Sequence, residues 1–236
     1  MIPNRTKWMV ARRASCVVSS TRTKITVEQW QVSSFTVAVA GDKFCVVASD
    51  TRSTLGYTIM SRKYQKVTKL TSRVVIATAG MRTDTDAFHK VMKTRIKTYI
   101  ATHGKEPKIS AVAQLLSNTL YSRRFFPFYT FNLLAGVDEQ GNGKMYGYDA
   151  IGSYDEVNCG SFGSGQTMVT PILDSMFKDH NVLEPVAPTD MDDTTNVLRD
   201  GFHATAERDI YTGDGLELTF ITADGVRTVK EPLRRD

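Results

Sequence analysis

The chain has 236 residues, 41% hydrophobic and 23% charged, so it is long enough to bury one substantial core, and its composition excludes disorder throughout. Its three cysteines and four histidines are scattered, which excludes a disulfide framework and gives no metal-binding spacing. No apolar run approaches the roughly 20 residues of a membrane-spanning helix, so the sequence predicts a soluble protein without a membrane partner.

A net charge of +5 raises the question of nucleic-acid binding, but much of the excess lies at one end of the chain. The first 30 residues are basic and rich in Ser and Thr, and no acidic residue precedes Glu28. Such a start fits either a mitochondrial transit peptide or a basic extension lying on a partner. We prefer the extension, residues 1–32, because the segment has no clear amphipathic helical period.

The first half of the chain predicts strands followed by two helices. Small and β-branched residues predict a hairpin of strands 35–40 and 44–49 around Gly41-Asp42-Lys43. Shorter strands are expected at 57–61, 65–70 and 73–79. Apolar residues then recur every three or four positions, which predicts one helix from the caps at 83–86 to His103 and another beginning at Ser110.

The second half repeats this order. We expect strands at 130–137, 144–150 and 153–157, helices at 166–178 and 192–208, and a closing hairpin of 216–222 and 226–230. Hairpin-linked strands favour antiparallel sheets, and each helix pair needs an apolar surface to cover. The sequence therefore predicts an α+β fold in which two stacked antiparallel sheets are flanked by helix pairs, all in one domain.

Three motifs have a functional and a plain interpretation. "GSFGSG" (160–165) resembles a phosphate-binding loop, but its spacing is not that of a dinucleotide or P-loop motif, which favours a tight strand-to-helix connection. "TDMDD" (189–193) offers cation ligands, yet acidic residues are stabilised at a helix start without metal. "SRRFFPFYTF" (122–131) fits a nucleic-acid stacking platform or a subunit contact, and we favour the contact.

A further polar set lies at the ends of predicted strands. Asp50 follows an apolar strand, Lys66 stands 16 positions later, and Asp209 precedes Thr212 at a helix-to-strand turn. A lysine held by carboxylates can lower the pKa of a hydroxyl at the start of the first strand. The sequence alone does not show that these groups converge.

Three segments carry a family resemblance: "TVAVAGDKFCVVASDTRSTLGY", "YSRRFFPFYTFNLLAGVDEQGNGKMYGYDAIGSYDE" and "AERDIYTGDGLELTFITADGVR". Together they resemble the beta-type subunits of the eukaryotic 20S proteasome, most closely the sixth beta type, across residues 33–236. The resemblance implies the four-layer αββα sandwich of the N-terminal nucleophile hydrolases. In active members of that family, a threonine exposed at the start of the first strand attacks the substrate, with its own freed amine as base.

Carried over by position, the family's supporting residues correspond to Asp50, Lys66, Ser164, Asp209 and Thr212. Counting back from Asp50 places Ser34 at the nucleophile position, or Phe35 if the hairpin is one residue shorter. Ser33 stands where active members have the glycine of the Gly-Thr cleavage junction. The resemblance thus implies that Ser34 and its supporting residues are a vestigial constellation without a catalytic role.

The expected function is that of a non-catalytic structural subunit. The resemblance implies a place in a heptameric beta ring, contacts with an alpha ring and with the opposite beta ring, no cofactor or metal, and a location in cytoplasm and nucleus. One alternative is an active serine-type peptidase that uses Ser34. Another is a basic nucleic-acid-binding protein, which the localised charge makes the least favoured.

Overall fold

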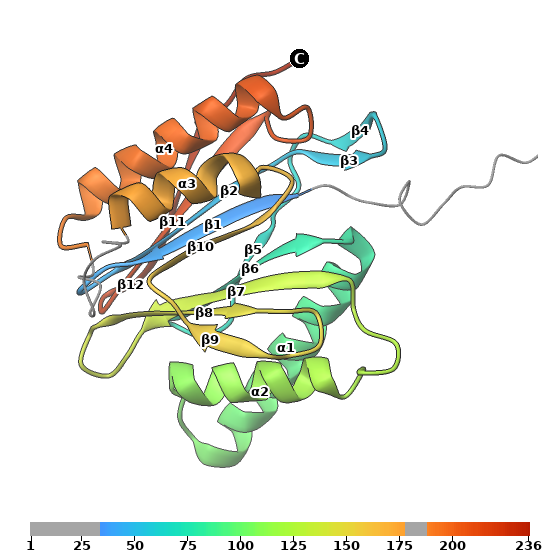
Figure 1. Cartoon of the computed structure of the whole chain (residues 1–236). Coiled ribbons are helices and arrows are strands. Elements are labelled where there is room, and N and C mark those ends of the chain that lie inside the picture. The colour runs from blue at the N-terminus through green and yellow to red at the C-terminus, as the bar shows by residue number, and fades with distance from the viewer. Residues whose placement is uncertain (1–33, 178–187) are drawn as a thin grey trace, which may run out of the picture.

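The structure is a computed structural model that describes residues 34–177 and 188–236. The expected basic extension, residues 1–32, lies outside these residues. The described chain forms four layers: two sheets lie against one another, and a helix pair covers the outer face of each (Figure 1). The expected fold class is confirmed.

The first sheet has five antiparallel strands in the order β10-β1-β2-β11-β12. These are β10 (Cys159–Gly163), β1 (Phe35–Ala40), β2 (Cys45–Asp50), β11 (Gly215–Thr222) and β12 (Gly225–Pro232). Its outer face is covered by α3 (Gln166–Phe177) and α4 (Met191–Arg208). Asp190 caps α4 by accepting a hydrogen bond from the Asp192 backbone N–H at 2.9 Å. The acidic run therefore starts a helix, as the plain interpretation predicts.

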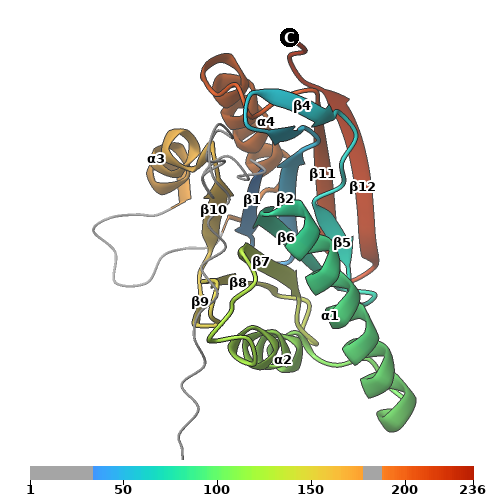
Figure 2. The ribbon, with the colours of Figure 1, turned by 90° about the vertical axis from the view of Figure 1, so that its right-hand side faces the viewer.

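The second sheet has the order β5-β6-β7-β8-β9 and is also antiparallel. Its strands are β5 (Val67–Lys69), β6 (Val74–Gly80), β7 (Thr130–Val137), β8 (Gly143–Tyr148) and β9 (Tyr154–Glu156). Helices α1 (Arg82–His103) and α2 (Ile109–Tyr121) cover it on the side away from the first sheet (Figure 2). A small hairpin of β3 (Ser53–Leu55) and β4 (Thr58–Ser61) stands apart from both sheets.

Alternation along the strands divides the interior into three apolar layers. In β1, Val37 and Val39 belong to the cluster that packs under α3 and α4, whereas Ala38 and Ala40 belong to the cluster between the sheets. A third cluster joins the outer face of the second sheet to α1 and α2. Both faces of each central strand are buried, so these strands read as continuous apolar runs. None of the helices within the described ranges has the length and hydrophobicity to span a bilayer.

The glycine-rich segment connects a strand to a helix as predicted, but most of it belongs to the strand itself. Residues Cys159–Gly163 form strand β10, and only Ser164 and Gly165 connect it to α3. Gly163 pairs with Phe35 of β1 and has a φ of 114°. A Cβ at Gly163 would stand 1.8 Å from the Ser34 carbonyl oxygen, so no side chain fits. The glycines allow the two strands to approach closely. In the sequence alone, the same glycines give the segment the composition of a loop.

Smaller differences concern the helix starts and the hairpin β3–β4. The N-cap of α2 is Lys108, not Ser110, and it makes no side-chain cap hydrogen bond. The N-cap of α1 is Met81, and Asp84 in its first turn accepts from the Tyr129 backbone N–H at 2.8 Å. Strand β3 was not predicted, since its three residues carry no alternation long enough to detect.

A buried polar chain lies between α1 and the second sheet. The Thr78 hydroxyl donates to Asn132 Oδ1 at 2.8 Å and lies 2.7 Å from His89 Nε2. Because the single hydroxyl proton goes to Asn132, His89 Nε2 must carry a proton and donate to Thr78. Burial, with a smaller contribution from Lys93, lowers the pKa of His89 to about 4. His89 is therefore neutral in the folded protein at pH 7.

This histidine should make stability fall in mild acid. As the pH falls below about 6.5, His89 binds a proton in the unfolded chain, whereas in the folded chain it stays neutral down to about pH 4. The free energy of unfolding therefore decreases between these two pH values, by up to about 3 kcal/mol. We expect His89→Gln, which keeps a donor near Thr78, to lack this component. Urea unfolding between pH 7 and 4.5 measures it, and His103→Gln at an exposed site is the control. Parallel pH profiles for wild type and His89→Gln would contradict the assignment.

Candidate functional site

Asp50, the last residue of β2, is the centre of the site. Its carboxylate is fully buried and forms an ion pair with the Lys66 ammonium group, which is also fully buried. It also accepts backbone hydrogen bonds from Phe35 at 3.1 Å, from Arg52 at 3.3 Å and from Gly213. Four separate chain segments therefore meet at one carboxylate.

Burial dominates the electrostatics of this pair. It raises the pKa of Asp50 and lowers the pKa of Lys66, since each charged form loses its hydration. The ion pair opposes both shifts, and Asp209 raises the pKa of Lys66 further. Arg52 acts in the opposite direction on Lys66.

Ser34 immediately precedes β1 and is buried. Its hydroxyl oxygen accepts a hydrogen bond from the Gly80 backbone N–H at 3.0 Å. Within the part of the chain that the structure describes, the Ser34 side chain makes no hydrogen bond to Lys66 or to Asp50.

Asp209 and Thr212 form a compact turn after α4. The Thr212 hydroxyl donates to Asp209 Oδ2 at 2.7 Å, and the Tyr211 backbone N–H donates to Asp209 Oδ1 at 3.1 Å. The turn places Gly213 against Asp50, while the charge of Asp209 acts on Lys66. The structure thus brings together Asp50, Lys66, Asp209 and the Thr212–Gly213 turn near the start of β1.

Ser164 lies at the same end of the first sheet but is set apart from this group. It follows Gly163, which touches the Ser34 carbonyl, and precedes Gly165, which packs against Phe35. The Ser164 hydroxyl oxygen is buried without a hydrogen-bond partner in the residues that the structure describes. It makes no hydrogen bond to Asp50, Lys66 or Asp209 there.

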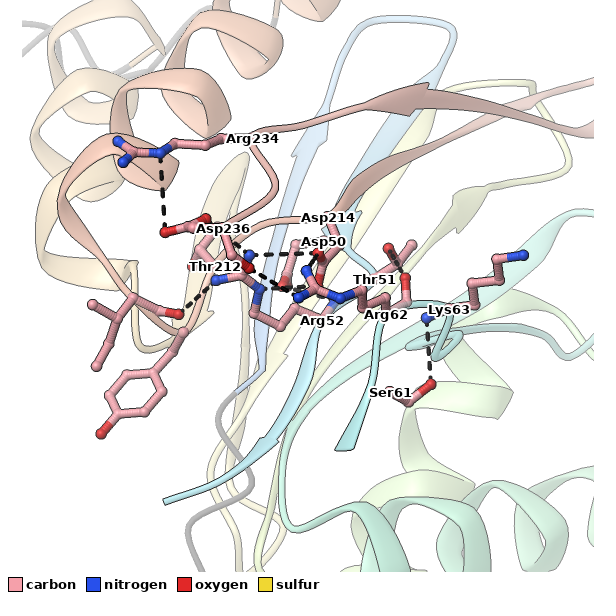
Figure 3. Close-up of polar contacts among 12 residues, drawn as sticks. Asp50, Thr51, Arg52, Ser61, Arg62, Lys63, Thr212, Asp214, Arg234 and Asp236 are labelled. Atoms are coloured by element: carbon pink, nitrogen blue, oxygen red, sulfur yellow. Dashed lines mark hydrogen bonds and ion pairs between the residues drawn. The ribbon is translucent and has the colours of Figure 1, made fainter. Parts of the chain in front are cut away.

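A second buried ion pair beside Asp50 was missed by the sequence reasoning. Arg52 Nε donates to Asp214 Oδ2 at 2.9 Å, and both side chains are almost completely buried. Arg62 binds the other side of Asp214, and Arg52 also reaches Asp236 Oδ1 at 3.2 Å (Figure 3). A Cβ at Gly213 would lie 2.6 Å from Arg52 Nη2 and 2.9 Å from the Arg234 carbonyl oxygen, so a side chain at this position would force the guanidinium or the backbone to shift. The available signal was an arginine two positions after Asp50 and an aspartate directly after the Thr212–Gly213 turn.

The site lacks features that would hold a metal. Within residues 34–177 and 188–236, no group of three or more His, Cys, Asp and Glu side chains is arranged to bind an ion. The chemistry available is that of a hydroxyl, a lysine and carboxylates, which is the donor set of nucleophilic acyl transfer.

The comparisons with known proteins decide the family. The model of the "Proteasome subunit" family matches residues 33–221. The chain belongs to the proteasome beta-subunit family. It is 44% identical over 205 residues to "Proteasome subunit beta type-1" of Arabidopsis thaliana, covering 85% of this chain and 92% of that protein.

Further relatives of this beta subunit come from distant organisms. The beta type-1 subunit of Dictyostelium discoideum is 44% identical over 203 residues, covering 85% of this chain and 86% of the relative. "Proteasome subunit beta type-6" of Saccharomyces cerevisiae is 34% identical over 210 residues, covering 85% and 87%. The predicted membership of the beta-type subunits is confirmed, while the type number in the relatives' names differs between organisms.

The buried ion pair gives a stability prediction. Lys66→Met leaves the Asp50 carboxylate buried without its cation, which we expect to lower the free energy of unfolding by about 3–5 kcal/mol. Adding Asp50→Asn to that variant should recover part of the loss, because the unpaired charge is removed. Urea unfolding at pH 7 measures both variants.

A matched control is Lys144→Met, which breaks the exposed ion pair with Glu156 and should cost less than about 1 kcal/mol. Equal losses for Lys66→Met and Lys144→Met would show that the buried pair has no special role in stability.

Proposed function

We propose that this proteasome beta subunit is a non-catalytic, structural member of the 20S core particle. The observation that carries the proposal is the state of Ser34. Its hydroxyl accepts a hydrogen bond from the Gly80 N–H, and Ser33-Ser34 stands where active members carry Gly-Thr. A hydroxyl without an adjacent base is a weak nucleophile at neutral pH.

The alternative, a serine-type peptidase using Ser34, is favoured by one observation. Asp50, Lys66 and Asp209 meet near the start of β1, where a nucleophile would need them. We assign these groups a structural role instead. Lys66 neutralises a buried carboxylate, and that carboxylate joins the ends of β1, β2 and the turn after α4.

Mass spectrometry of the purified particle tests the proposal directly. We expect no cleavage between Ser33 and Ser34, and no adduct on Ser34 after incubation with a peptide electrophile that labels the active threonines of other subunits. A chain that begins at Ser34 and carries an adduct, lost in Ser34→Ala, would establish the peptidase. In the expected case, Ser34→Ala leaves the peptidase activity of the particle unchanged.

We further propose contacts with neighbours in a heptameric beta ring, with an alpha ring and with the opposite beta ring. The segment after α2 supports such contacts, since Phe125 and Phe126 are 99% and 84% exposed beside Arg123 and Arg124. Exposed aromatic residues next to arginines are enriched at protein interfaces. This favours the subunit contact over a nucleic-acid platform for this segment.

We also propose that the subunit acts in cytoplasm and nucleus, with no cofactor. The three scattered cysteines of the sequence fit a reducing compartment, and among the described residues Cys45 is a buried thiol that donates to the Gly136 carbonyl at 3.1 Å. Burial raises its pKa to about 12, so it is unreactive. Cell fractionation tests the location and distinguishes it from a mitochondrial one.

Assembly should depend on the exposed aromatic side chains. Because Phe125 and Phe126 are exposed, the double change to serine should leave the fold of the chain intact and lower its incorporation into particles at least tenfold. Native gel electrophoresis of tagged subunits measures incorporation. The double change to leucine keeps apolar contact area and is the matched control. Normal incorporation of the serine variant would rule out this segment as a contact.

A further inference from the structure

A basic groove runs along α1, on the outer side of the second sheet. It has a volume of about 630 Å³, and its other wall is the chain around β5, including Gln65 and Thr68. Figure 2 shows α1 extending along the sheet edge at which β5 lies. The exposed side chains that α1 contributes to the groove include Lys90, Lys93 and Lys97.

The charge of this groove is unbalanced. After Asp86, the rest of α1 contains no acidic residue. Lys90, Lys93 and Lys97 have no carboxylate within ion-pair distance among the described residues. Their spacing of three and four positions places them on one face of the helix, where like charges destabilise it by a few tenths of a kcal/mol per pair. The lysines therefore do not serve the stability of the isolated helix.

The other charged groups of the groove are already engaged. Asp86 accepts a hydrogen bond from the Tyr64 hydroxyl at 2.9 Å and lies 3.8 Å from Arg82 Nε. The Arg82 guanidinium covers the Tyr64 ring at 4.5 Å from its centre. Arg82 thus occupies one face of the Tyr64 ring and leaves less aromatic surface on which a nucleic-acid base could stack. This disfavours single-stranded nucleic acid as the occupant.

An extended acidic peptide fits the dimensions of the groove. From Lys90 to Lys97 the helix rises about 10 Å. Alternate carboxylates over five residues of extended chain span about 13 Å, within reach of flexible lysine side chains. We infer that the groove formed by Lys90, Lys93 and Lys97 against β5 binds an extended acidic segment of a partner protein. The inference goes beyond the proposed structural role, because this binding and ring assembly can fail separately.

Fluorescence anisotropy with the full chain tests the inference. The probe is a labelled hexaglutamate peptide, compared with hexaglutamine and with a single-stranded oligonucleotide of equal charge. Hexaglutamate should bind, and its affinity should fall as the salt concentration is raised. The affinity should fall at least tenfold in the variant Lys90→Gln/Lys93→Gln/Lys97→Gln. Hexaglutamine should not bind.

The matched control is Lys43→Gln/Lys63→Gln/Lys105→Gln, which removes the same charge at exposed positions outside the groove and should change affinity less than twofold. Thermal unfolding verifies that each variant is folded, and native gels verify that the groove variant still enters particles. Equal losses in both triple variants, no binding of hexaglutamate, or tighter binding of the oligonucleotide would each overturn the inference. Loss of assembly in the groove variant with hexaglutamate binding retained would also overturn it.

Discussion

The buried carboxylate of Asp50 is the constraint on which the packing around the start of β1 depends. A charge without water must be compensated, and here Lys66 and three backbone N–H groups do so from four segments of the chain. Those segments are the start of β1, the residue before β5, the residues after β2 and the turn after α4. The contacts that position Asp50 and Lys66 beside the start of β1 therefore also join the two sheets at this end. Such a set of contacts stabilises the fold whether or not a nucleophile stands beside it.

These contacts are compatible with the proposed non-catalytic role. Asp50 and Lys66 hold one another with their charges satisfied, and neither needs Ser34 to do so. Ser34 in turn satisfies its hydroxyl through Gly80. The first strand keeps its position whether or not the residue before it reacts. Proposed contacts of Phe125 and Phe126, and the proposed groove on α1, lie on other surfaces of the molecule and place separate demands on the sequence.

Much of the fold could be predicted because the local patterns agreed with it. The β1–β2 hairpin, the two helix pairs and the closing hairpin all have strong periodicity or turn residues, and their order implies the layers. Strand β10 could not be predicted in the same way. Its glycines have the composition of a loop, and the reason for them, the approach of β10 to the Ser34 carbonyl, is a contact across more than a hundred residues.

The site was predictable as a set of residues but not as a network. Family resemblance indicated Asp50, Lys66 and Asp209, while the Arg52–Asp214 pair carried no local pattern that marks it as buried. Burial of an arginine is decided by the closing of the turn after α4 and by the last residues of the chain. Neither is visible in the sequence around Arg52.

The contacts of Asp236 tie the last residue of the sequence to the buried Arg52–Asp214 ion pair. Arg52 binds the Asp236 side chain, and Arg62 donates to its backbone carbonyl at 2.9 Å. Chain ends ordinarily fray at little free-energy cost. Here, displacement of Asp236 would remove a partner from a guanidinium that lies against Asp214 and next to Asp50 (Figure 3). The half-exposed Asp236 is therefore linked through Arg52 to the buried Asp214.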